Sequence, residues 1–307
     1  MSGNNFGLND NYKYYEFEID SLDNNGSFRS GSAATDWPVF LLGGKAPLSN
    51  IAAIKIIEAQ IPFSWYVFNS GNNSFYLYEQ GNYVTFATVT LPIGNYTTGQ
   101  MVTNLQTALN AATMNSLTYT VSYDPVTLKF TFTNTGTQPF AFSFGADNNS
   151  GNINPRLYIG FPGGYTYSTA QTMVAPNAAL VSGPNYVYVN SQKIGQLCNM
   201  YLPQGAFNLG GGNAGPQMAK IPVNVQSGGI IYWQEPDPQK WFDFENLTQL
   251  NQVDFYLTLG NTTTQTPLRL NGLGFSLKLG ILINTMDKSS NYGGGNLDRV
   301  VKRIKLI

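Results

Sequence analysis

Two segments near the end of the chain place an apolar side chain at every second position. This alternation runs from Val253 to Leu259 and again from Phe275 to Ile283. Successive side chains of a β-strand point to opposite faces of a sheet, so a period of two predicts two half-buried strands. Other segments in which this period dominates lie earlier in the chain, at residues 15–19, 51–61, 186–189, 221–225 and 230–233. The chain is therefore expected to be mainly β.

One segment has helical spacing instead. From Gly99 to Ala112, apolar residues recur at steps of three and four, and Thr97 or Thr98 stands where a helix N-cap is expected. The segment belongs to a stretch, residues 68–182, whose two ends are rich in Asn and Gly. This stretch also contains a hairpin pattern around Asp124-Pro125. We expect it to be an inserted α+β module with one amphipathic helix.

The strands before and after this stretch are expected to pair with one another, because an unpaired sheet edge promotes association with other chains. We therefore expect residues 1–67 and 183–307 to form one discontinuous domain, an antiparallel jelly-roll sandwich interrupted by the inserted module. Within the segment 51–61, the doublet Ile56-Ile57 breaks the alternation and predicts a β-bulge.

Charged residues are scarce. They make up 11% of the 307 residues, less than half of the ~25% usual in soluble globular proteins. The formal net charge is −1, so no long-range field attracts the chain to nucleic acid or to an anionic membrane. Apolar runs have strand length, too short to span a bilayer. A surface of neutral polar residues and glycine favours an assembled subunit, with no specific nucleic-acid partner and no membrane span.

The residues of common catalytic sites are largely missing. The sequence has no histidine, so it lacks the usual general base and the commonest transition-metal ligand. It has one cysteine, Cys198, so no disulfide can form within the chain. We expect no enzyme activity, no catalytic residue, no metal and no cofactor. Cys198 is interpreted as a small buried hydrophobe, and a reactive thiol is the alternative. Residues 1–10 lack the pattern of a secretory signal, so synthesis in the cytoplasm is expected.

The densest group of carboxylates lies between Trp233 and Trp241 and just beyond. Its members are Glu235, Asp237, Asp243 and Glu245. Paired carboxylates flanked by aromatic rings are typical of carbohydrate-binding or glycoside-hydrolysing grooves. Pro236 and Pro238 interrupt the segment, however, and favour a structural loop. We expect the structural loop.

Two further patterns have structural explanations. Oxygen ligands for calcium are offered by Asp20, Asp23, Asn24 and Asn25, but their spacing matches no ordered calcium loop, so a turn is expected. The runs Gly210–Gly212 and Gly293–Gly295 lack the strand, helix and Lys-Ser/Thr context of a phosphate-binding loop. They are interpreted as flexible loops.

The end of the chain carries its one basic cluster. The cations Arg299, Lys302, Arg303 and Lys305 are concentrated among apolar residues after a Gly/Asn linker. These four residues are candidates for an interface, either with a neighbouring subunit or toward the genome. A final edge strand with solvated cations is the alternative.

Three stretches together resemble one known family. They are Asn73-Ser74-Phe75 with residues 89–97, 119–121 and 159–161; Met218–Val223 with Gly229–Tyr232; and Leu250–Leu257 with Leu268–Gly272 and Phe275–Leu279. Their order is similar to that in the penton proteins of virophages and polinton-like viruses, which belong to the double-jelly-roll virus lineage.

This resemblance implies a structural capsid protein. A penton subunit would form homopentamers at the fivefold vertices of an icosahedral virion, contact the double-jelly-roll major capsid protein and point its module outward. The motif Leu41–Gly44 resembles sites cut by maturation proteases of that lineage. The alternative function is a viral spike or fibre that binds host glycans through exposed Tyr and Trp of the module.

Overall fold

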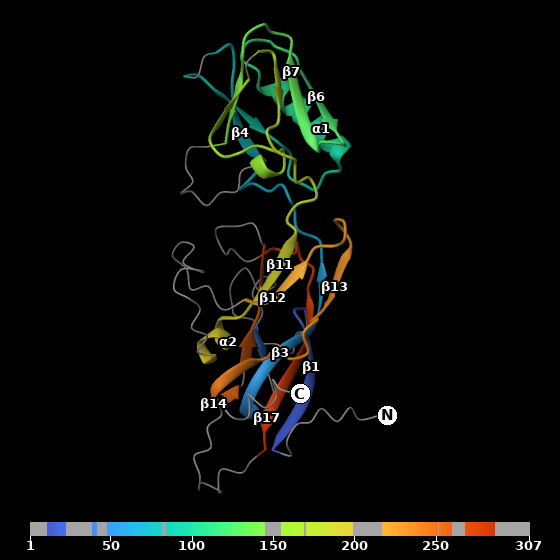
Figure 1. The fold of residues 1–307 in the computed structure, drawn as a ribbon, viewed down its shortest axis with the longest axis vertical. Coiled ribbons are helices and arrows are strands. Elements are labelled where there is room, and N and C mark those ends of the chain that lie inside the picture. The colour runs from blue at the N-terminus through green and yellow to red at the C-terminus, as the bar shows by residue number, and fades with distance from the viewer. Residues whose placement is uncertain are drawn as a thin grey trace. The chain divides into compact units, whose positions relative to one another are not determined.

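The chain forms two compact units (Figure 1). Unit 1 consists of residues 1–65 and 186–307, and unit 2, here called the module, consists of residues 66–185. The structure is a computed structural model that describes residues 11–22, 39–41, 48–81, 84–144, 155–168, 170–198, 217–250, 252–259 and 268–285. Every strand pair in these ranges is antiparallel. The predicted fold class is confirmed: the protein is mainly β, consistent with a jelly-roll-type sandwich.

The main sheet of unit 1 joins the first and last described strands. Its strands are β1 (Tyr12–Asp20), β17 (Ser276–Asn284), β3 (Leu48–Pro62), β13 (Ile230–Gln234) and β14 (Phe242–Leu250). β1 pairs with β17 along its whole length, from Tyr12 opposite Asn284 to Asp20 opposite Ser276. The other side of β17 pairs with β3. One face of these central strands buries alternate apolar side chains such as Ile54, Leu279 and Ile281.

The predicted bulge in β3 is confirmed. Glu58 lies opposite Lys278, whereas the next partner pair is Ile56 with Leu279, so the register shifts at Ile57. Because β3 has one extra residue there, the buried positions change from Ile54 and Ile56 before the shift to Ala59 and Ile61 after it.

Two smaller sheets complete unit 1. One has the order β12 (Gln217–Pro222), β11 (Tyr186–Asn190), β16 (Tyr256–Leu259), and the other pairs β15 (Gln252–Asp254) with β2 (Val39–Leu41). The short helix α2 (Gln192–Leu197), which the sequence pattern did not predict, follows β11.

The prediction of one half-buried strand over 253–259 is wrong. The segment divides at Phe255, because Val253 pairs with Phe40 while Leu257 pairs with Val189 of a different sheet. The alternate residues Asp254 and Thr258, expected on a solvated face, are buried. A strand that passes from one sheet to another is covered on both faces, which the alternation alone does not reveal.

The described part of the module has two sheets and one longer helix. One sheet has the order β5 (Ala87–Thr90), β4 (Ser74–Tyr78), β8 (Ala141–Ser143), β9 (Tyr165–Tyr167), and the other has the order β10 (Thr172–Val174), β7 (Lys129–Asn134), β6 (Tyr119–Asp124). A single 3-10 turn spans Pro155–Leu157. Between these sheets lies an aromatic core, in which the Phe142 ring centroid is 5.0 Å from that of Phe132 and 5.6 Å from that of Phe161.

Helix α1 (Thr98–Ala112) matches the sequence prediction closely. Thr97 is its N-cap and forms a capping box with Gln100. Met101, Leu105 and Leu109 are fully buried, as their spacing predicts. The part of the chain that the structure describes contains no helix long and apolar enough to cross a membrane.

Two parts of the module have structure that the sequence pattern did not reveal. The Gly-rich stretch 163–183 contains β9 and β10, which pair with β8 and β7. Leu128 is 46% exposed and has a φ of 60°, a turn conformation that ends the turn of the hairpin before β7 begins.

Candidate functional site

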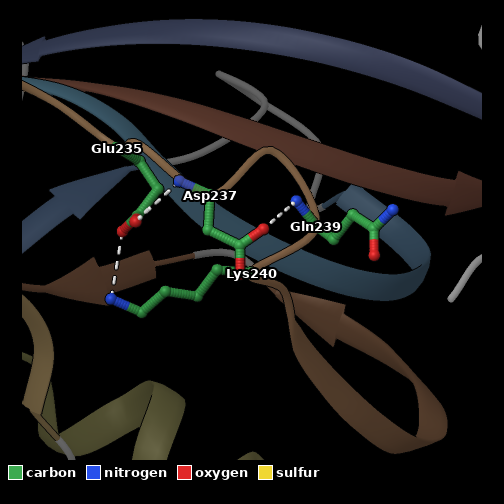
Figure 2. A network of polar contacts seen from close by, with 4 residues as sticks. All are labelled: Glu235, Asp237, Gln239 and Lys240. Atoms are coloured by element: carbon green, nitrogen blue, oxygen red, sulfur yellow. Dashed lines mark hydrogen bonds and ion pairs between the residues drawn. The ribbon is translucent and has the colours of Figure 1, made fainter.

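In the acidic loop between β13 and β14, the carboxylates of Glu235 and Asp237 bond to other groups of the same loop. Glu235 Oε2 lies 3.0 Å from Lys240 Nζ, and Glu235 Oε1 accepts a hydrogen bond from the Asp237 amide at 3.3 Å (Figure 2). Asp237 Oδ1 in turn accepts one from the Gln239 amide at 2.8 Å. Such side-chain to backbone bonds are typical of turns. The expected structural loop agrees with this geometry.

Lys55, on strand β3 of the main sheet, holds the loop against this sheet. Lys55 Nζ donates to the carbonyl oxygen of Pro238 at 3.1 Å and lies 4.5 Å from the centroid of the Trp241 ring. Tyr14 lies on the other side, its ring centroid 5.9 Å from the same nitrogen. Burial lowers the pKa of Lys55 despite the nearby carboxylates of Glu16, Glu235 and Asp237. The Trp241 ring, which would line a sugar groove in the alternative interpretation, thus contacts a cation.

The remaining acidic candidates lie only partly within the described residues. Asp20 accepts a hydrogen bond from the Leu22 amide at 2.8 Å, as expected of a turn, while Asp23, Asn24 and Asn25 lie outside the described residues. Asp243 is exposed on β14. The described ranges hold no cluster of three or more His, Cys, Asp or Glu that could bind a metal ion.

Cys198 is buried at the end of α2, as predicted. Its exposed fraction is 2%. Burial raises the pKa of the Cys198 thiol to about 12, and the negative charge of Asp243 adds to the effect. The thiolate, the reactive form, is strongly disfavoured there.

Two buried carboxylates escaped the sequence analysis. Glu79, which is 1% exposed, accepts hydrogen bonds from the backbone amides of Met114 and Asn115 at 3.0 Å each. Asp254 accepts from the amides of Gln192 and Lys193 at the start of α2. Both carboxylates satisfy backbone donors at a helix end, so their function is structural. An acidic residue within an apolar run, as at Asp254, was the available signal.

The module also carries a cluster of five aromatic rings, four of them exposed, here called the aromatic platform. Its members are Tyr76, Tyr78, Phe86, Tyr165 and Tyr167. The strand register explains how it forms: β4 and β9 flank β8, and their tyrosines lie opposite the small residues Ala141 and Ser143. These two small residues are almost completely buried, so the neighbouring rings cover them.

The rings of the aromatic platform contact one another in sequence. The Phe86 centroid lies 4.5 Å from that of Tyr76 and 5.7 Å from that of Tyr78. Across β8, the Tyr78 and Tyr165 centroids are 5.6 Å apart, and their hydroxyl oxygens are 3.4 Å apart. Tyr165 and Tyr167 are nearly parallel, at 10° and 5.9 Å. The platform is a continuous row from Phe86, just before β5, to β9.

The other sequence candidates fall outside the described part of the chain. These are the four basic residues Arg299, Lys302, Arg303 and Lys305, the glycine runs 210–212 and 293–295, and residues 42–44 of the Leu41–Gly44 motif. Leu41 itself belongs to β2 and pairs with Gln252. The interface role of the four cations and the processing of the motif remain predictions.

Comparison with known proteins gives structural likeness only. No protein-family model matches the chain, and no curated protein matches it in sequence. Among solved structures, the chain is similar to the mavirus penton protein, with 12% identity and a TM-score of 0.48 over 88% of this chain and 98% of that chain. It is also similar to a chain of the Sputnik virophage structure, with 14% identity and a TM-score of 0.42 over 92% and 99% of the two chains. The first of these structures is of a penton protein, and the second is of a virophage.

Proposed function

We propose that this chain is a structural capsid protein, the penton subunit that forms homopentamers at the fivefold vertices of an icosahedral virion. The sequence resemblance supports this assignment, and so does a surface poor in charge. Large permanent interfaces can be covered by neutral and aromatic residues because they are never left exposed to water.

The observation that carries the proposal is the edge strand β13. It pairs with β3 and with no other described strand, and its five residues, Ile230–Gln234, include no charge. Ile230 is 63% exposed and Tyr232 is 52% exposed. Edge strands of monomeric proteins are usually protected by charged residues, so an edge of this kind is suited to a permanent neighbour.

The opposite edge of the same sheet has a different character. β1 carries Lys13, Glu16 and Glu18, and Lys278 Nζ on the adjacent strand lies 2.7 Å from Glu16 Oε2. The two edges are therefore unlike. A closed ring requires heterologous contacts, in which one surface of each copy packs on a different surface of the next. The proposed ring places the β13 edge in the contact between copies.

The proposal extends to partners and place. The flanks of the pentamer contact the double-jelly-roll major capsid protein, and the module faces outward, where it meets a host receptor. The chain is synthesised in the host cytoplasm and ends in the virion. No catalytic step is assigned to it, because the carboxylates of the acidic loop bind their own turn.

The mass of the purified protein in solution tests the proposal. Native mass spectrometry should find five copies. Ile230→Lys should convert the pentamer to smaller species, because it places a charge on the uncharged edge. Ile93→Lys is the matched control: Ile93 is 52% exposed but lies in the module. A stable monomer that binds sugars would instead favour the spike or fibre function, and a pentamer that tolerates Ile230→Lys would remove β13 from the interface.

A further inference from the structure

We propose that the aromatic platform of the module is a binding site for a neutral oligosaccharide. The site does not depend on the oligomeric state, so it is separable from the penton assignment. None of the four tryptophans lies between residues 66 and 185, so tyrosine and phenylalanine supply every ring in the module. This corrects the expectation that Trp contributes to glycan binding there.

The chemistry of the platform combines ring faces with hydroxyl groups. Tyr165 and Tyr167 present two nearly parallel rings along β9, and both are about half exposed, at 45% and 52%. Sugar rings have apolar C–H faces bordered by hydroxyls. An aromatic surface with polar tips can stack on the former and hydrogen-bond the latter. Two parallel rings in series suit a ligand of repeated sugar units.

The absence of charge on the five platform residues favours a neutral ligand. None of the five is charged, and Glu79, next to Tyr78 in the chain, is buried and bonded to the end of α1. Burial raises the pKa of Tyr78 to about 12, and its hydrogen bond with Tyr165 adds to this, so the Tyr78 hydroxyl stays protonated at neutral pH. A sialylated or sulfated glycan would find no cation among these residues to pair with its charge.

The area of the platform suits a small ligand better than a second protein copy. Its four exposed rings, Tyr76, Phe86, Tyr165 and Tyr167, have exposed fractions of 38%, 47%, 45% and 52%. With ~200 Å² for each aromatic side chain, they offer about 360 Å². A stable protein interface needs ~800 Å² on each partner. The platform alone therefore falls well short of a subunit contact.

Glycan binding by the full-length protein tests this inference. The probes are an array of neutral oligosaccharides of glucose, galactose and N-acetylglucosamine, together with sialylated and sulfated counterparts, followed by titration of the best neutral binder. Tyr165→Ala and Tyr167→Ala should each weaken binding about tenfold, the scale of one lost aromatic contact. Tyr167→Phe, which keeps the ring, should retain most of the affinity. Thermal melts of each variant establish that it is folded.

Tyr66→Ala is the matched control, because Tyr66 is 48% exposed and lies outside the platform. It should leave binding unchanged. Absence of binding to every neutral probe would overturn the proposal, as would selective binding of charged glycans, or neutral binding that survives both alanine variants. Loss of pentamers in Tyr165→Ala or Tyr167→Ala, with no glycan bound by the parent, would show instead that the platform is a protein interface.

Discussion

The Tyr119 hydroxyl donates a hydrogen bond of 3.0 Å to the buried carboxylate of Glu79, 40 positions earlier in the chain. The same carboxylate accepts bonds from Thr113 and Asn115 just after α1, so it joins β4, the helix end and β6. Burial, and then the charge of Glu79, raises the pKa of Tyr119 far above its ordinary value, so Tyr119 remains a donor. This network fixes where the helix stops.

Replacing Glu79 by Ala should lower the free energy of unfolding by about 2–3 kcal/mol, because several buried donors lose their acceptor together. Chemical denaturation measures the change. Glu18→Ala is the control, since Glu18 is exposed on β1, and it should cost less than about 0.5 kcal/mol. Equal effects of the two substitutions would contradict the assigned role of the network.

Substitutions at Gly160 and Gly164 distinguish the cost of backbone strain from the cost of a steric clash. Both glycines have positive φ, +82° and +78°, but a Cβ on Gly160 would lie 2.4 Å from the Asn177 carbonyl oxygen, whereas nothing lies within 4 Å of one on Gly164. Gly164→Ala should cost about 1 kcal/mol from the left-handed conformation alone. Gly160→Ala should cost clearly more, because backbone has to move. Thermal melts of the two variants compare them, and similar costs would mean that the Asn177 segment yields freely.

The single thiol should react only when the protein unfolds. Because Cys198 is buried and its pKa is raised to about 12, its labelling by a disulfide reagent at pH 8 should be at least ~100-fold slower in the native protein than in guanidinium. The raised pKa also sets the sign of a pH effect. The contribution of the neutral thiol to stability is complete below pH 9 and is lost as pH rises toward 12. Rapid labelling of the native protein would contradict this burial.

Residues 66–185 should fold without the rest of the chain. They contain an aromatic core with Phe132, Phe142 and Phe161, and a helix capped within the segment. The expressed segment is expected to melt cooperatively and to give dispersed amide resonances. An unfolded segment would show that the module depends on unit 1, and it would remove the predicted inserted domain.

The sequence predicted those elements whose pattern reflects local physics. Helix α1 was predicted together with its cap, because both signals are local in the sequence. They are the N-cap residue Thr97 and the apolar stripe of Met101, Leu105 and Leu109. The bulge at Ile57 was likewise visible as a break in period. Strands β1, β3, β13 and β17 were expected from their alternation, and the structure adds one to three residues at most of their ends.

Pairing over long distances was less accessible. The division of 253–259 into β15 and β16 depends on partners near residues 40 and 188, which no local pattern identifies. The aromatic platform depends on Ala141 and Ser143 lying between two tyrosine strands, and this requires the strand order. The role of Glu79 likewise becomes visible only when its donors, up to 40 positions away, are brought together.

The pairing of β1 with β17 also orders the events of synthesis. The main sheet of unit 1 lacks one of its central strands until residue 284 has been made, whereas every described strand of the module is present by Val174. Contacts between distant residues form slowly, and domains generally fold as units while the ribosome is still at work. In the growing polypeptide the module can therefore form before β1 and β17 can pair, and the surfaces proposed for assembly form last.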